Sequence, residues 1–151
     1  MGYENRQDIP VKYTWDLSAI YPNETLLEKD CAAAGELIGK IKNYEGKLNN
    51  EKSIYEFFEL TGDIEELFEK AICYTHMKMD EDSKNTDVQA MRDKVMSIYN
   101  KYSVATSFVQ PELSRLDEKT LDEIMAKPQF KKHNYTCLLY TSPSPRDKRQ
   151  S

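Results

Sequence analysis

The side chains best suited to metal binding or catalysis lie near the middle of the chain, at Cys73 and His76. A thiol and an imidazole three positions apart on a helix share one face and could begin a zinc site. Such a site needs three or four ligands, and His133, the only other histidine, has no second ligand beside it. We therefore interpret Cys73 as a core residue and His76 as partly exposed. The sequence predicts no catalytic, cofactor-binding or metal-binding residue in this chain.

An acidic run follows at Asp80, Glu81 and Asp82 and could suggest a calcium loop. An EF-hand needs glycine at its sixth position and glutamate at its twelfth, where this chain has Asn85 and Met91. The run is therefore interpreted as a solvated connector. Spacing alone leaves Ser/His/Asp catalysis open, although no serine stands in a nucleophile-elbow pattern. The zinc-peptidase motif His-Glu-x-x-His is absent from the whole chain.

Two repeats of mostly apolar positions predict the helices that carry these residues. Steps of three and four residues are typical of the buried face of a helix. The first repeat comprises Ile54, Phe57, Thr61, Ile64, Phe68, Ala71 and Thr75, and the second Val88, Met91, Val95, Ile98, Tyr102, Ala105 and Val109. A polar joint separates them, so the sequence predicts an antiparallel helical hairpin of residues 53–79 and 86–109. Capping boxes at Ser53 and Thr86 mark the expected helix starts.

The hairpin is predicted to belong to an all-α helical bundle. Asn23 can cap a first helix that stops near Gly46, and a short helix is expected over 117–126. We predict three parts: an extended segment over 1–22, a helical lobe over 23–135 and a tail over 136–151. Trp15 is expected to anchor the first segment by burial against the helices.

The tail has a different character from the rest of the chain. Residues 137–147 read CLLYTSPSPRD, which is similar to the translation of a common transposase sequencing adapter. Alternating serine and proline cannot continue a helix. We therefore expect residues 136–151 to be foreign and disordered, and the natural reading frame to be interrupted near Tyr135.

Charge, hydropathy and cysteine spacing limit the classes of partner and the cellular compartment that we expect for this protein. The net charge of −5 and pI of about 5.2 argue against a nucleic-acid partner. No apolar run approaches the roughly 20 residues of a membrane span, and the polar N-terminus lacks a signal-peptide core. We therefore expect a cytoplasmic protein without a membrane partner. Its three cysteines, Cys31, Cys73 and Cys137, are widely spaced and are expected to stay reduced.

Several patches of sequence together carry a family resemblance. They are Arg6, Ile9-Pro10 and Tyr13 with the Trp15-Asp16-Leu17-Ser18-x-Ile20-Tyr21-Pro22 run, the Tyr44-Glu45-Gly46-Lys47-Leu48 run, Tyr74 with Met79-Asp80-Glu81-Asp82, and Ser107-Phe108 with Pro111-Glu112-Leu113. In this order, they resemble the N-terminal part of oligoendopeptidase F, in the thimet-oligopeptidase-like zinc metallopeptidase family. The resemblance covers about residues 6–130. It departs from the family at Leu26-Leu27, where an aromatic residue is common.

The resemblance implies a helical lobe that covers a deep channel and limits substrates to oligopeptides. In the parent enzyme, two histidines and a glutamate in a distant C-terminal domain hold zinc, and the motif glutamate activates water. This chain contains none of those residues, so we expect it to bind no zinc and to be inactive without the missing catalytic domain. We also expect an exposed apolar patch on helix one or over 113–130, with self-association.

Two other functions remain open from the sequence. The chain could be a free-standing helical interaction module that uses the hairpin as a partner groove. It could also be an independent enzyme with an unrecognised site. The sequence following Tyr135 in the uninterrupted gene distinguishes these alternatives, since a downstream His-Glu-x-x-His would support the peptidase lobe.

Overall fold

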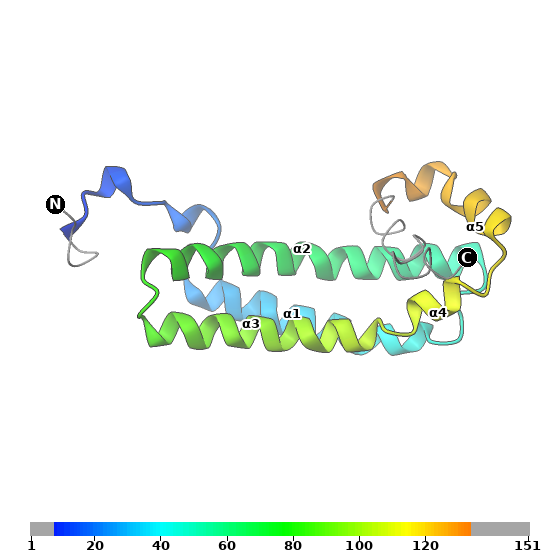
Figure 1. The fold of residues 1–151 in the computed structure, drawn as a ribbon, viewed down its shortest axis with the longest axis horizontal. Helices are drawn as coiled ribbons and strands as arrows, with labels where there is room; N and C mark the ends of the chain where they lie inside the picture. Colours follow the sequence, from blue (N-terminus) through cyan, green and yellow to red (C-terminus); the bar gives the residue numbers. More distant parts are fainter. Residues whose placement is uncertain (1–7, 134–151) are drawn as a thin grey trace, which may run out of the picture. The chain divides into compact units, whose positions relative to one another are not determined.

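The computed structural model describes residues 8–133, and these residues form helices without any strand (Figure 1). The all-α prediction is confirmed. The predicted tail over 136–151 lies outside the described residues. The α-helices are α1 (Glu24–Ile41), α2 (Glu51–Glu81), α3 (Thr86–Ala105), α4 (Val109–Leu113) and α5 (Glu118–Met125). The short 3-10 turns are η2 (Val11–Tyr13), η3 (Leu17–Ala19), η4 (Lys42–Tyr44) and η5 (Pro128–His133).

The hairpin is formed by α2 and α3, which are joined by four polar residues over 82–85. Every position of the first predicted repeat is buried, with exposed fractions of 4% or less. The second repeat alternates buried and half-buried positions. The observed α2 is two residues longer at each end than predicted, and α3 ends four residues earlier, at Ala105.

Asparagines cap both hairpin helices, so the predicted capping boxes are wrong. Asn50 Oδ1 accepts a hydrogen bond from the Ser53 N–H at 3.1 Å. Asn85 Oδ1 accepts from the N–H groups of Asp87 and Val88, at 3.0 and 3.2 Å. An asparagine just ahead of a helix satisfies the same free N–H groups that a serine or threonine would have satisfied.

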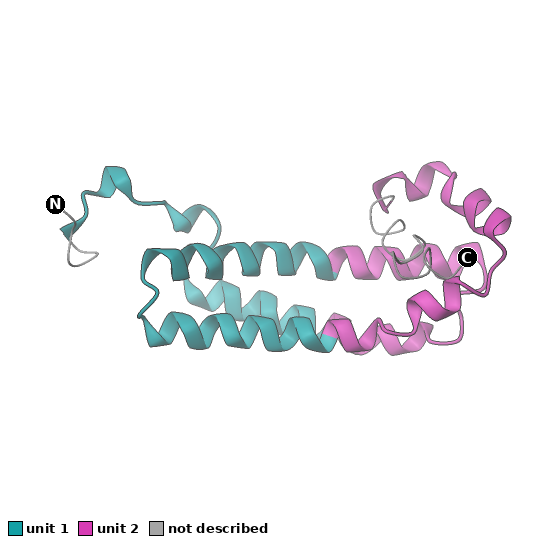
Figure 2. Cartoon of the chain, in the orientation of Figure 1, with its two compact units in different colours: residues 1–36, 64–101 teal, residues 37–63, 102–151 magenta. Residues whose placement is uncertain are grey.

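The chain divides into two compact units (Figure 2). Unit 1 comprises residues 1–36 and 64–101, and unit 2 comprises residues 37–63 and 102–151. Each of the three long helices contributes residues to both units. The division into an N-terminal segment, a lobe and a tail rests on sequence character and stays a prediction.

Unit 1 shows that the prediction for Trp15 is wrong, because 52% of this residue is exposed. The Asp16 carboxylate accepts from the Ser18 N–H at 3.1 Å and shapes the turn η3. This turn directs Leu17 inward, and Tyr21 is buried edge-on against Tyr74 with ring centroids 5.2 Å apart. The N-terminal segment is thus anchored after the tryptophan, which precedes the turn.

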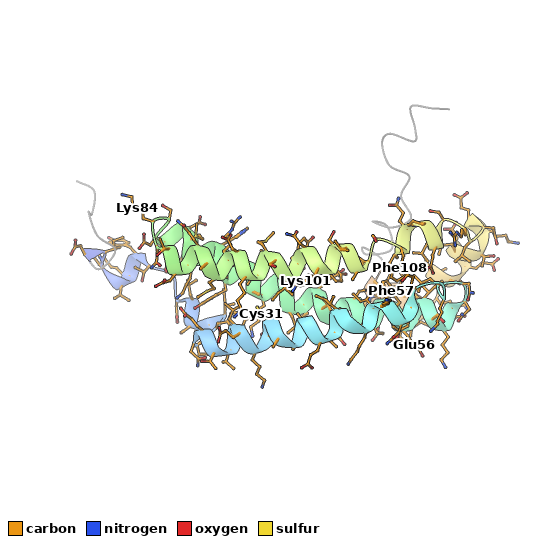
Figure 3. The ribbon with its side chains drawn as sticks, turned by 90° about the horizontal axis from the view of Figure 1, so that it is seen from below. Cys31, Glu56, Phe57, Lys84, Lys101 and Phe108 are labelled. Carbon is orange, nitrogen blue, oxygen red and sulfur yellow. The ribbon has the colours of Figure 1, made fainter. Side chains whose placement is uncertain are left out.

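Unit 2 is built around Phe57 of α2, which is fully buried (Figure 3). Its ring makes edge contacts with Tyr44 of η4 at 5.8 Å and with Phe108 at 6.0 Å between centroids. Phe108 precedes α4, a helix that the sequence did not predict. Pro111 lies in the first turn of α4, where a backbone N–H would have no helical partner and its absence costs nothing.

Candidate functional site

The structure does not assemble a metal site from the residues considered in the sequence. Cys73 is exposed, against the prediction of a core position, and its sulfur lies 3.8 Å from the Met77 sulfur. His76 is also exposed. Among residues 8–133, no three His, Cys, Asp or Glu side chains are grouped so that they could hold a metal ion. Cys31 and Cys73 are both free of disulfide bonds.

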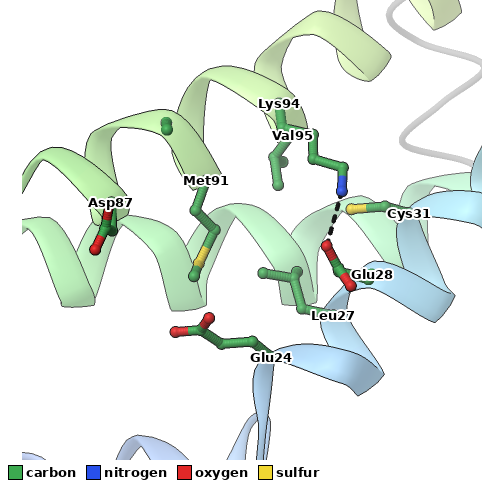
Figure 4. A pocket seen from close by; sticks show the side chains of 9 residues that line it. Glu24, Leu27, Glu28, Cys31, Asp87, Met91, Lys94 and Val95 are labelled. Carbon is green, nitrogen blue, oxygen red and sulfur yellow. Dashed lines mark hydrogen bonds and ion pairs between the residues drawn. The ribbon is translucent and has the colours of Figure 1, made fainter.

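Unit 1 contains a groove of about 240 Å³ between α1 and α3 (Figure 4). Its floor is apolar and includes Leu27, Cys31 and Val95, of which Cys31 and Leu27 are 6% and 2% exposed. Its rim is charged and comprises Glu24, Glu28, Asp87 and Lys94. A groove with an apolar floor can receive an aliphatic or aromatic side chain.

Two of the rim carboxylates form ion pairs, Glu28 with Lys94 of the rim and Glu24 with Lys78 of α2. Lys94 Nζ lies 3.0 Å from the Glu28 carboxylate, and Lys78 Nζ lies 3.4 Å from Glu24. Burial raises the pKa of the Cys31 thiol, and the nearby Lys94 opposes this only in part. The thiol is therefore protonated and a poor nucleophile. The groove offers apolar contact rather than a reactive group.

Two of the sequence patches that carry the family resemblance meet in unit 2. The Glu112 carboxylate accepts hydrogen bonds from the Gly46 N–H at 2.5 Å and from the Leu48 N–H at 3.2 Å. Gly46 has φ of +78°, a backbone conformation that favours glycine. The glycine lets the chain turn so that both N–H groups reach one carboxylate. These motif residues therefore form a structural clamp between the turn after η4 and α4.

Replacing Glu112 by alanine is expected to lower the free energy of unfolding by about 1.5–3 kcal/mol, the usual range for hydrogen bonds to a charged group. Glu112→Gln keeps one acceptor oxygen and should lose less. Urea denaturation followed by circular dichroism measures both losses. Glu123→Ala on the exposed face of α5 is the control, with an expected change below about 0.5 kcal/mol. An equal loss in Glu112→Ala and the control would show that the clamp contributes nothing.

Within residues 8–133, no helix is both long enough and apolar enough to cross a membrane. No protein-family model matches the sequence, and no solved structure matches it.

Curated relatives do match the sequence over most of its length. Oligopeptidase PepF of Bacillus subtilis is 27% identical over 143 residues, which cover 93% of this chain and 21% of the relative. Group B oligopeptidase PepB of Streptococcus agalactiae is 29% identical over 134 residues, covering 87% of this chain and 22% of the relative. The plasmid-encoded oligoendopeptidase F of Lactococcus lactis subsp. cremoris is 25% identical over 134 residues, with the same coverage.

The chain spans about a fifth of the length of these relatives. Their names agree with the family that the sequence patches indicated. The resemblance is thereby confirmed, and the chain is a relative of the oligoendopeptidase F peptidases that corresponds to about a fifth of their length.

Proposed function

We propose that this chain is the N-terminal helical lobe of a larger oligopeptidase, where it covers the channel that leads to the catalytic centre. The observation that carries the proposal is the match to peptidases about five times as long, over most of this chain. The all-helical structure supports it, as does the clamp between two resemblance patches. In this role the lobe restricts access to the channel to oligopeptides.

Zinc and the catalytic residues belong to another part of the parent enzyme. The chain has two histidines and no His-Glu-x-x-His motif, and residues 8–133 bring together no three potential ligands. Its own residues therefore do not fit a peptidase zinc site. The partner of this lobe is the catalytic domain of the same enzyme, the substrate of the whole enzyme is an oligopeptide, and its compartment is the cytoplasm.

We propose that the surface that contacts the catalytic domain lies on α1 rather than over residues 113–130. Leu113, Ile124 and Phe130 are buried within unit 2, so they cannot form it. The groove of unit 1 lies along α1, and Leu26 of the same helix is 39% exposed. We therefore place the contact surface of unit 1 on α1. Self-association through this surface stays a prediction.

The purified chain is expected to hydrolyse no peptide and to bind no zinc tightly, because it supplies neither the motif nor a third ligand. A quenched fluorogenic peptide of about ten residues measures hydrolysis, and metal analysis after mild chelation measures zinc. The product of the uninterrupted gene is the matched comparison and should cleave the same peptide. Peptide cleavage by the chain alone, or stoichiometric zinc that His76→Ala removes, would contradict the proposal.

A further inference from the structure

Residues 127–133 of unit 2 are held against α2 by charged groups at both of their ends. Glu51 of α2 binds the Lys127 ammonium and accepts from the Gln129 amide at 2.8 Å. Two turns further along α2, the Glu59 carboxylate lies 2.6 Å from Lys132 Nζ and 2.6 Å from His133 Nε2. Because an ionised carboxylate only accepts hydrogen bonds, Nε2 carries the hydrogen and donates it.

Between these charged ends lies an aromatic contact. Phe130 of η5 is fully buried, with its ring 5.6 Å from Tyr55 and 6.4 Å from Phe58 between centroids. The His133 ring stacks on Phe58 at 5.8 Å, and its Cε1 lies 3.5 Å from where a Cβ on Gly62 would stand. The missing side chain at Gly62 therefore gives the imidazole room against α2.

Few buried side chains hold this part of the chain apart from those contacts. In residues 118–133, which we name the clasp arm, only Ile124, Phe130 and His133 are buried. The charged partners stay partly exposed, with 36% of the Glu59 side chain and 60% of the Lys132 side chain accessible. Segments with few buried contacts open at a lower free energy than the core does, and exposed ion pairs weaken in salt.

We propose that the clasp arm is a releasable strap on α2, which opens before the rest of unit 2 unfolds and is loosened by salt and by acid. Opening uncovers the rings of Tyr55 and Phe58, and closing covers them again. The Phe130 ring keeps the closed arm in register, while the carboxylates of Glu51 and Glu59 set how often it opens. This inference rests on unit 2 alone and does not depend on the proposed peptidase role.

The direction of the acid effect follows from Glu59. Hydrogen bonds from Lys132 and then His133 lower its pKa, so its ionised form stabilises the closed arm. That stabilisation is complete above the ordinary glutamate pKa and is lost as the pH falls through the lowered value. The other titratable groups near this pair are Tyr55 and Asp63 of α2, which both act on Lys132.

Hydrogen–deuterium exchange measured by mass spectrometry on the whole chain tests the proposal. Glu59→Gln should accelerate exchange in residues 118–133 about fivefold, while residues 54–63 of α2, which belong to unit 2, keep their rate. Raising sodium chloride from about 0.05 to 0.5 M should accelerate the arm of the unchanged protein and have less effect in Glu59→Gln. Lowering the pH from about 7 to about 3, after correction for intrinsic exchange, should also accelerate exchange in the arm, because it carries Glu59 below its lowered pKa.

Glu56→Gln is the matched control, because Glu56 lies on the same helix and its Lys52 pair is long, at 3.9 Å, and exposed. It should leave exchange in the arm unchanged. The double variant Glu59→Gln/Lys132→Gln should accelerate exchange in the arm by less than the product of the two single accelerations, because both substitutions remove the same ion pair. Equal acceleration in the control, or exchange of the arm only in step with residues 54–63 of α2, would overturn the proposal.

Discussion

Phe57→Ala is expected to lower the free energy of unfolding of unit 2 by about 3–5 kcal/mol, the range for removing a buried aromatic side chain. Phe57 has no exposed surface, and its ring contacts Tyr44, Phe58 and Phe108. These neighbours come from η4, from α2 itself and from the segment ahead of α4. The cavity left by alanine would therefore separate three parts of the unit that cannot all close around it.

Urea denaturation followed by circular dichroism measures this loss, with the change in midpoint as the readout. Phe57→Leu keeps most of the apolar volume and should lose clearly less. Val104→Ala is the control, since 74% of Val104 is exposed and its change should stay within about 0.5 kcal/mol. A loss for Phe57→Ala no larger than for Val104→Ala would show that the ring is not part of a close-packed core.

Tyr21→Ala is expected to cost a similar amount in unit 1, about 3–5 kcal/mol, because a large aromatic side chain is again lost from a packed site. Tyr21 is 2% exposed and its ring meets Tyr74 edge-on. Its hydroxyl donates to the Asp30 carboxylate at 2.8 Å, and the Lys70 ammonium lies 4.3 Å from the ring centroid. Burial, and then this hydrogen bond, raise the pKa of the Tyr21 hydroxyl.

Two further variants separate the sources of that stability. Tyr21→Phe removes only the hydroxyl and should cost about 1.5–3 kcal/mol, the usual range for a hydrogen bond to a charged group. Trp15→Ala should cost less than about 0.5 kcal/mol, because Trp15 is half exposed. The loss in free energy of unfolding should therefore decrease from Tyr21→Ala through Tyr21→Phe to Trp15→Ala. If the tryptophan anchored the N-terminal segment, Trp15→Ala would instead cause the largest loss.

The hairpin could be predicted because its signal is local and repeated. Apolar positions at Ile54, Phe57 and Thr61 recur every three or four residues, and only a helix places such positions on one face. Many positions agree with one another, so an error at one of them changes little. The exact ends depend on single residues, and there Asn50 and Asn85 cap the helices instead of Ser53 and Thr86.

The clamp and the clasp arm could not be predicted, because they join residues far apart in the sequence. Glu112 binds the Gly46 N–H across 66 positions, and His133 reaches Glu59 across 74. No periodic pattern relates such residues. The exposure of Trp15 escaped prediction for another reason: hydrophobicity shows that burial is favourable, but the turn made by Asp16 decides which side chain is buried.

The half-exposed position of Trp15 gives the protein a built-in optical reporter. It is the only tryptophan in the chain, so the indole emission of the whole protein comes from this one site. Because 52% of the residue is open to water, its emission should lie toward longer wavelengths and be readily quenched by acrylamide. Any molecule that settles over the N-terminal segment should shift the emission toward the blue and slow the quenching, without a label having to be attached.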